Sequence, residues 1–445
     1  MLKLRFLGNT RIPHHKNTSA MSPVRMTPPS EVLISMEQHI GAPAVPVVKV
    51  GDTVKVGQLI AQAGGYVSAP IHASVSGTVT KIEPQLKHNG NTVNAIRIAS
   101  DGLMQPYEEI TPPTITDADS FLEAIRQSGV VGLGGAGFPT AVKFDALKKG
   151  GIHTIILNGA ECEPYITSDA RTMLDDGEWI VQGLDLLRRY FPEVKKYIIG
   201  IEANKPECIT KMTDLFRDQA DVSVQSLPLR YPQGAEKVII NNTTGLVVPE
   251  GKLPADIGVL VTNVTTMACI AKHIATGMPL VERCVTVDGS AVAAPKNLIV
   301  PIGTSIHDVL EFAGEFSQEP GKIILGGPMT GSAVYSQDEP TLKTTGSIIA
   351  LAPKDSVDLP ISPCIHCGRC VDACPMSLVP TAFLKAMDME NTDERMTFLD
   401  EHSLNLCMSC GCCSFVCPAN RPLTENIRMA KTLLKDYKAH KASLK

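Results

Sequence analysis

Eight of the thirteen cysteines in this 445-residue chain lie near its C-terminal end, in two copies of one spacing. Each copy has three cysteines at intervals of three positions, then a fourth cysteine four positions later, directly before a proline. This spacing is typical of ligands to 4Fe–4S clusters, and in two-cluster ferredoxins the fourth cysteine binds the other cluster. The two runs are Cys364, Cys367, Cys370 and Cys374, and Cys407, Cys410, Cys413 and Cys417.

The spacing therefore predicts two adjacent 4Fe–4S clusters that carry single electrons. We expect Cys364, Cys367, Cys370 and Cys417 to bind one cluster, and Cys407, Cys410, Cys413 and Cys374 to bind the other. Structural zinc would not explain the third cysteine step or the proline. Disulfides between cysteines this close in sequence would be strained. Cys412 lies in the second run but out of register, so it is left out of the ligand set.

Length and charge limit the remaining possibilities. A chain of this length suggests about three domains or more. The net charge of −5 argues against a nucleic-acid partner. No apolar run approaches the ~18–20 residues that span a bilayer, so we expect no transmembrane segment in the chain. The other cysteines are scattered and odd in number, which is typical of a reducing compartment.

Basic residues gather at both ends of the chain. Residues 1–30 form a basic N-terminal arm with no acidic residue, and the last stretch of 353–445 is a basic tail. We expect both ends to be solvated. The alternative is that they dock on an acidic partner or on anionic lipid.

The pattern of strands and helices divides the rest of the chain. Short β-branched runs broken by glycine in 31–108 resemble the barrel-sandwich hybrid of biotinyl and lipoyl carrier domains. The hairpin tip at 64–68 lacks the carrier lysine, so a structural or docking module is expected. Strands alternate with helices in 109–282, which predicts a largely parallel sheet. Short strands return in 283–352, and 353–445 holds the cysteine runs between helices.

A glycine-rich loop at 132–137 is the second chemical signal. Glycines allow a close approach of the backbone to a ligand, and a helix starting near Thr140 would add the positive end of its dipole. Gly132, Gly134 and Gly137 match the Rossmann fingerprint, and Glu161 lies where a ribose-binding acid is expected. Only two β-branched residues precede the loop, so the fingerprint lacks a clear preceding strand. A tight turn is the alternative interpretation.

Four segments in order resemble the NADH-oxidising, FMN-binding subunit of respiratory complex I. They are Gly134 to Lys143, Asn158 to Pro164, Tyr231 to Glu236, and Asn263-Val264. The chain departs from the complex I pattern at Leu133, Ala160, Ala235 and Thr262, which bears on the fine flavin contacts. The region that follows, 284–304, resembles the soluble-ligand-binding β-grasp (SLBB) domain of the same family.

The resemblance implies a set of residues that bind FMN and NAD(H). Backbone amides from Gly132 to Ala136 would face the flavin phosphate, and Lys143 would add a point charge. Phe138 would stack on the nicotinamide or adenine ring, or else pack the loop, and Glu163 would hold the nicotinamide side. No general base is expected, because hydride transfer needs none. The full set is Gly132, Gly134, Gly135, Ala136, Gly137, Phe138, Lys143, Asn158, Glu161, Glu163, Tyr231, Glu236 and Asn263.

The order of these parts resembles the C subunit of Rnf complexes, which are membrane-bound, ion-translocating ferredoxin:NAD+ oxidoreductases. The resemblance implies a multidomain α/β fold with barrel-sandwich hybrid, Rossmann-like FMN/NADH, SLBB and two-cluster ferredoxin domains. It also implies an NADH-linked oxidoreductase subunit that is peripheral to the cytoplasmic face of the cell membrane. The other subunits of the complex would be its partners, and ferredoxin would reach it only through one of them.

Two alternatives stay open at this point. A cobalamin reductase of the propanediol-utilisation type has a similar flavin fold and paired clusters. A flavin-free iron–sulfur relay subunit would keep the clusters but bind no NAD. The departures at Ala160, Ala235 and Thr262 keep the relay possible.

Overall fold

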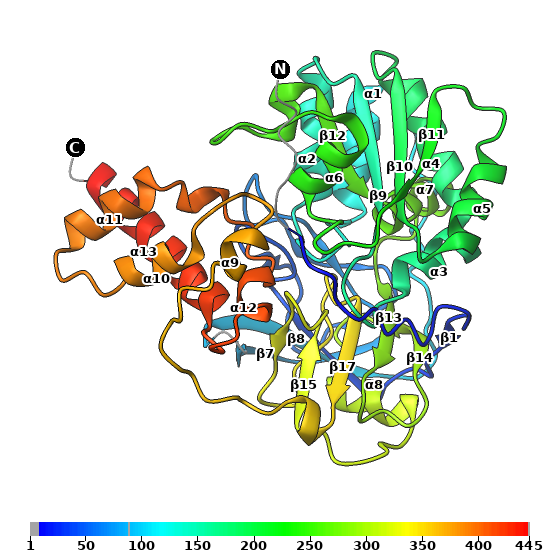
Figure 1. The fold of residues 1–445 in the computed structure, drawn as a ribbon. Coiled ribbons are helices and arrows are strands. Elements are labelled where there is room, and N and C mark those ends of the chain that lie inside the picture. Colours follow the sequence, from blue (N-terminus) through cyan, green and yellow to red (C-terminus); the bar gives the residue numbers. More distant parts are fainter. Residues whose placement is uncertain (1–8, 88–89, 444–445) are drawn as a thin grey trace.

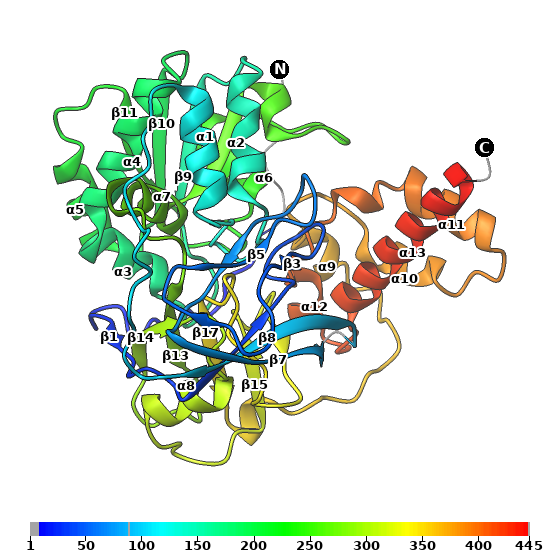
Figure 2. The ribbon, with the colours of Figure 1, turned by 180° about the vertical axis from the view of Figure 1, so that it is seen from behind.

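A computed structural model describes residues 9–87 and 90–443 of the chain. It contains an α/β domain, two β-rich parts and a helical part that carries the cysteine runs (Figure 1). The helical part lies to one side of the other three in both views (Figures 1 and 2). Among the described residues, no helix combines the length and the apolar content needed to cross a membrane.

The first β-rich part is a sandwich of two small sheets, which lies in front in Figure 2. Strands β2 (Glu31–Ser35), β8 (Thr92–Ser100), β7 (Gly77–Leu86) and β4 (Thr53–Val54) pair in this order. The second sheet contains β3 (Val45–Pro46), β5 (Leu59–Gln62) and β6 (Ile71–His72). Apolar side chains alternate inward along the strands and bury a common core, as period-two patterning predicts.

The α/β domain is built on a parallel four-stranded sheet, as predicted. Its strand order is β11 (Val222–Leu227), β10 (Lys196–Glu202), β9 (Thr154–Gly159) and β12 (Val259–Asn263). Buried residues of the strands and of the packed helices form its main core. The helices are α1 (Ala118–Gln127), α2 (Thr140–Lys148), α3 (Ser168–Asp175), α4 (Gly177–Tyr190), α5 (Pro206–Leu215), α6 (Glu236–Thr244) and α7 (Val264–Thr276).

The second β-rich part, which we call the SLBB region, packs one helix on a mixed sheet. The helix is α8 (Ile306–Ala313), and its apolar side joins the sheet in a separate core. The sheet runs β1 (Val24–Arg25), β14 (Lys296–Pro301), β13 (Glu282–Asp288), β17 (Ser347–Leu351), β15 (Lys322–Leu325) and β16 (Ser332–Ala333). Its edge strand β1 comes from the N-terminal arm, and Val24 of β1 pairs with Leu298 of β14.

The helical part, 353–443, is called the cluster domain below. Two short helices, α9 (Arg369–Asp372) and α12 (Cys412–Phe415), carry cysteines of the two runs. Three longer helices, α10 (Pro380–Ala386), α11 (Thr392–Glu401) and α13 (Leu423–Ser443), pack on one another around a core that includes Cys370, Cys374 and Cys413.

The prediction of solvated ends is wrong for much of the described N-terminal segment, 9–30. This segment crosses between the α/β domain and the SLBB region (dark blue in Figure 1). Ile12, Thr18 and Met26 are buried, and the ammonium group of Lys16 points inward onto backbone carbonyls. The segment packs against the protein because it carries apolar residues between its charged residues.

The basic tail is also not free along its length, because it forms helix α13. Lys431 donates to the carbonyl oxygen of Cys407 at 2.8 Å, and Lys438 pairs with Asp400 at 2.5 Å. The tail therefore belongs to the cluster domain, although most of its charged side chains stay at the surface.

Candidate functional site

A cavity of about 680 Å³ opens at the carboxyl ends of β9 and β12, where open α/β sheets bind their ligands. We call it the interdomain cavity, because the SLBB region and the cluster domain complete its wall. Residues of 325–332 and 342–346 line one side, and 408–410 with Arg428 line another. Its wall also contains twelve of the thirteen predicted cofactor residues: Gly132, Gly134, Gly135, Ala136, Phe138, Lys143, Asn158, Glu161, Glu163, Tyr231, Glu236 and Asn263.

The amides at the start of the glycine loop are hydrogen-bonded within the protein. The Gly132 amide donates to the carbonyl oxygen of Phe138 at 2.8 Å, and the Leu133 amide donates to Thr266 Oγ1 at 3.0 Å. The prediction that these two amides face a phosphate is therefore wrong. The remaining predicted member, Gly137, lies outside the cavity wall, and its amide donates to the carbonyl oxygen of Gly132 at 3.1 Å.

The tip of the loop is the part that faces open space. Gly135 has φ of +108°, and a Cβ atom there would meet no heavy atom within 4 Å. Among the described residues, the amides of Gly134, Gly135 and Ala136 have no protein acceptor. Helix α2 begins at Thr140 as predicted, without a side-chain cap, and the buried Thr140 hydroxyl has no partner in the described chain. These groups form a cradle that suits an anion such as a phosphate.

Lys143 lies one turn into α2 and reaches across the cavity wall. Its Nζ lies 2.7 Å from Glu236 Oε1 and donates to the carbonyl oxygen of Val261 at 2.8 Å. The structure thus brings together two predicted residues that are 93 positions apart. Both side chains are over a third exposed toward the cavity, so their pairing is one that a bound anion can compete with.

The loop that follows β9, residues 160–167, presents two acids. Glu161 has φ of +47°, and its Oε1 accepts from the Asp169 amide at 2.6 Å. Its Oε2 is buried and has no partner among the described residues. Burial raises the pKa of Glu161 to about 7. Asp169 in turn accepts from Asn263 Nδ2 at 2.7 Å, and Asn263 caps α7.

Glu163 and Tyr231 lie where the three domains meet. Glu163 accepts from the Met329 amide at 3.1 Å and from the Thr330 hydroxyl at 2.5 Å, both in the SLBB region. The Tyr231 hydroxyl lies 3.2 Å from Glu163 Oε1 and 2.7 Å from the carbonyl oxygen of Cys410. Its single proton is best placed for the nearer acceptor. Glu163 is therefore held by protein groups as well as exposed to the cavity, and burial raises its pKa.

The eight motif cysteines fall into two spatial groups. Burial is the main cause that raises the pKa of Cys370. The thiols of Cys417 and Cys364 also raise it, so they lie near Cys370. The thiols of Cys410 and Cys407 likewise act on the pKa of Cys374, so they lie near it. The fourth cysteine of each run therefore lies with the other run. A small cavity has five cysteines in its wall, Cys374, Cys407, Cys410, Cys412 and Cys413. Four of them are motif cysteines, which we call the second group, and four such thiols around one space suit an iron–sulfur cluster.

Cys410 is the motif cysteine that the two cavities share, and its neighbours Met408 and Ser409 also line both. It lines the small cavity among the four thiols and also lines the interdomain cavity. Among the described residues, no cysteine of the other group lines the interdomain cavity, and Cys367 of that group is exposed. A redox group in the interdomain cavity would therefore lie against the second cysteine group.

Several residues of the interdomain cavity were not predicted from sequence. Asp169, Thr140 and Cys162 lie within or beside the recognised motifs, and their side chains could have been suspected from position alone. Thr330 and Arg428 belong to other domains and carry no motif. Only the packing of the domains brings them to the cavity.

Comparisons with known families agree with this architecture. Residues 125–272 match the Nuo51 FMN-binding domain, and 360–421 match a 4Fe–4S dicluster domain. Residues 4–103 match the RnfC barrel-sandwich hybrid domain, and 284–333 match the SLBB domain. The predicted fold is confirmed in all four parts. The matches identify an electron-transfer protein of the flavin and iron–sulfur class.

Curated relatives narrow the class to one family. The C subunit of the proton-translocating ferredoxin:NAD+ oxidoreductase complex of Clostridium ljungdahlii is 43% identical, over 86% of this chain and 84% of its own length. The C subunit of the Na+-translocating ferredoxin:NAD+ oxidoreductase complex of Acetobacterium woodii is 41% identical, over 84% of this chain and 85% of its own length. The chain belongs to the family of C subunits of ion-translocating ferredoxin:NAD+ oxidoreductases, the Rnf complexes. This confirms the predicted family.

Among solved structures, an NAD+-reducing [NiFe]-hydrogenase in the H2-reduced state is also similar. The likeness covers 72% of this chain and 63% of that one, with 18% identity and a TM-score of 0.47.

Proposed function

We propose that this chain is the peripheral subunit that exchanges hydride with NAD(H) at FMN and single electrons through two 4Fe–4S clusters. The observation that carries the proposal is the position of Cys410 in the walls of both cavities. NAD(H) exchanges two electrons at once and the clusters exchange one, whereas a flavin does both when bound between them. The interdomain cavity, beside the second cysteine group, is where such a group would be useful.

The residues present suit FMN in the interdomain cavity. The free amides at 134–136 and the start of α2 would hold its phosphate, with Lys143 adding a positive charge. Asn158, Glu161 and Asn263 would contact the flavin through their polar atoms. Phe138 and Glu163 would take the nicotinamide nucleotide on the open side. Gly132 and Gly137 shape the loop rather than bind.

We assign the cluster ligands by the two spatial groups. Cys374, Cys407, Cys410 and Cys413 would hold the cluster nearer the interdomain cavity. Cys364, Cys367, Cys370 and Cys417 would hold the outer cluster, from which electrons pass to or from other subunits. Through those subunits the chain would exchange electrons with ferredoxin at the cytoplasmic face of the membrane.

One anaerobic experiment tests this proposal against the flavin-free relay. The purified chain is assayed for acid-extracted flavin, for iron, and for NADH oxidation with an artificial acceptor. We expect one FMN, about eight iron atoms from two 4Fe–4S clusters, and NADH turnover. Iron without flavin or turnover would leave only the relay. Co-purification with membrane subunits, rather than with a corrinoid enzyme, separates the proposal from a cobalamin reductase.

A further inference from the structure

The described N-terminal segment passes directly under the 160–167 loop of the interdomain cavity. The amide and carbonyl of Thr10 pair with those of Tyr231, both at 2.9 Å, and the Tyr165 amide donates to the carbonyl oxygen of His14 at 2.9 Å. Further along, the hydroxyls of Thr18 and Thr167 lie 2.5 Å apart. The N-terminal segment therefore runs alongside the 160–167 loop and is hydrogen-bonded to it.

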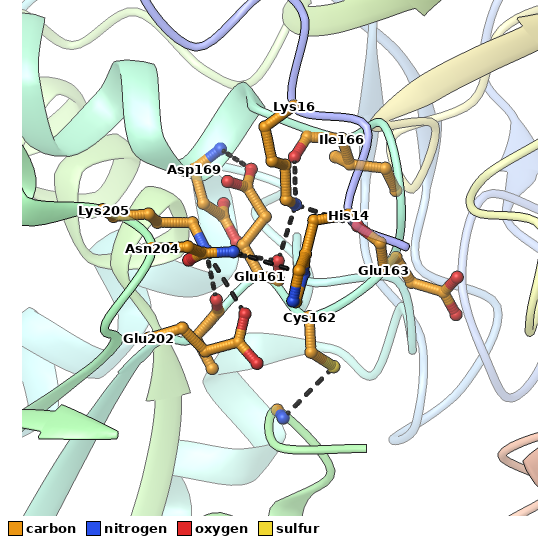
Figure 3. Close-up of polar contacts among 12 residues, drawn as sticks. His14, Lys16, Glu161, Cys162, Glu163, Ile166, Asp169, Glu202, Asn204 and Lys205 are labelled. Atoms are coloured by element: carbon orange, nitrogen blue, oxygen red, sulfur yellow. Dashed lines mark hydrogen bonds and ion pairs between the residues drawn. The ribbon is translucent and has the colours of Figure 1, made fainter. Parts of the chain in front are cut away.

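Lys16 makes the central contact of this segment. Its ammonium group donates to three backbone carbonyls of the loop: Glu161 at 2.8 Å, Glu163 at 2.9 Å and Ile166 at 2.6 Å (Figure 3). An ammonium group has three protons, so each one has an acceptor. The contacts span 145 to 150 positions in sequence, and all go to backbone rather than to side chains.

The loop needs such a support because its conformation is strained. Glu161 and Tyr165 both have positive φ, +47° and +69°, which non-glycine residues rarely adopt. Three carbonyls that converge on one point repel one another unless a cation lies between them. Lys16 supplies that cation, and the three carbonyl oxygens in turn hold its ammonium group.

A second lysine, Lys205, supports the start of the loop and also reaches the Glu161 carbonyl oxygen, at 3.4 Å. Lys205 donates to the carbonyl oxygen of Ala160 at 2.7 Å and lies 3.6 Å from Glu202, and both side chains are almost fully buried (Figure 3). Lys205 is part of the α/β domain, at the end of β10. Lys16 comes from the N-terminal segment, outside that domain, so the loop is complete only when this segment is in place.

We propose that Lys16 is a positioning residue of the interdomain cavity, which holds the 160–167 loop so that Glu161 and Glu163 face the bound flavin and nicotinamide. The inference rests on the proposed function of the cavity. The N-terminal segment is then part of the cofactor site, although no side chain of the segment lines the cavity.

The test compares the wild-type full chain with three variants of it, Lys16→Met, Lys16→Arg and Arg11→Met. Methionine keeps the length of the side chain but removes the charge and the donors. Arginine keeps both with a different shape. Arg11 is an exposed basic residue of the same segment, so Arg11→Met controls for loss of one positive charge. Hydrogen exchange of 160–169 is measured on anaerobic, flavin-free protein, and FMN affinity is then measured by titration.

We expect Lys16→Met to speed exchange in 160–169 and to weaken FMN binding by about tenfold or more, since hydrogen bonds to a charged group are strong. Lys16→Arg should recover part of both losses, and Arg11→Met should match the wild type. Wild-type exchange and affinity in Lys16→Met would overturn the proposal. So would faster exchange throughout the protein, because Lys16 would then serve general stability alone.

Two further outcomes are also decisive. If Lys16→Met does not fold, Lys16→Arg takes its place: weaker FMN binding with faster exchange confined to 160–169 supports the proposal, and any other pattern overturns it. If the wild type binds no FMN, the proposed function fails. The exchange data then judge the positioning role alone, since they are recorded without flavin.

Discussion

At the scale of single residues, the same residue type takes different roles according to its surroundings. Cys410 and Cys412 are two positions apart and both line the small cavity, yet only Cys410 fits the spacing of the cysteine run. The Cys412 thiol also packs with Ile12 and Tyr231, and a hydrogen bond with the Cys410 thiol, together with burial, raises its pKa. The motif spacing therefore separates the expected ligand Cys410, which precedes α12, from the packing residue Cys412, which begins it.

This contrast predicts different outcomes for two substitutions. Cys410→Ser should lose the inner cluster and about half of the iron, because one of four ligands is removed. Cys412→Ala should keep the full iron content and lose only about 1 kcal/mol of stability from a small cavity. Iron analysis and EPR of the reduced proteins check both. Loss of a cluster in Cys412→Ala would contradict the assignment.

Lys143 gives a second prediction at this scale. Lys143→Ala should weaken FMN binding by about tenfold or more while both clusters survive, because a charged donor to the phosphate is lost. The matched control is Lys148→Ala, at the end of the same helix, where the lysine pairs with Asp119 at the surface. Flavin and iron contents of both variants give the answer. Full FMN content in Lys143→Ala would reject its role.

At the scale of elements, the ends of strands and helices build the site. Strands β9 and β12 end side by side, so Asn158 and Asn263 pair in register at the cavity. Asn263 then caps α7 through its Oδ1, while its Nδ2 holds Asp169. One side chain thus starts a helix and orients an acid of the cavity wall.

Asn263→Ala should therefore have two separable effects. Loss of the cap should lower the free energy of unfolding by about 1 kcal/mol, and release of Asp169 should weaken FMN binding. Ser305→Ala is the control, because it removes the cap of α8 at a similar cost and Ser305 does not line the cavity. Chemical unfolding and FMN titration measure both. Equal FMN affinity in the two variants would show that Asn263 acts as a cap only.

At the scale of the whole molecule, a buried lysine joins three parts of the chain. Lys343 is fully buried and donates to the carbonyl oxygens of Pro70 and Gly129, both at 2.7 Å. Pro70 belongs to the barrel sandwich and Gly129 to the start of the α/β domain. Burial lowers the pKa of Lys343 to about 7, because it desolvates the charged ammonium group.

This lysine makes stability depend on pH in a defined direction. Between pH 7 and its ordinary pKa of 10.5, Lys343 binds a proton in the unfolded chain but not in the folded one. Stability therefore rises with pH across this window, by up to about 1.4 kcal/mol per pH unit. Lys343→Met should lack this contribution, so its stability relative to the wild type should fall from pH 7 to pH 9.

The measurement is anaerobic urea unfolding at several pH values, followed by the fluorescence of Trp179, the sole tryptophan. Effects of other titrating groups cancel in the difference between variant and wild type. Lys354→Met, at an exposed lysine, should show no change of that difference with pH. A constant difference for Lys343→Met would show that the lysine keeps its charge when buried.

The sequence by itself determined the chemical class and the kinds of domain, because those signals are local. Cluster ligands repeat at short intervals, and the glycine loop and the acids after β9 form compact motifs. Short β-branched runs broken by glycine likewise indicated the sandwich, and the alternation of strands with helices predicted the parallel sheet. Each of these patterns depends on neighbours within a few residues, so it is readable before folding.

Only the tertiary structure decided which distant groups meet. It placed Cys410 in the walls of two cavities, closed the Gly132 and Leu133 amides against the protein, and brought Lys16 beneath a loop some 145 residues away. The sequence predicted a solvated arm there, because a lysine among other charges has no local sign of burial. Its acceptors are backbone carbonyls, which every residue carries, so no side-chain pattern could have revealed them.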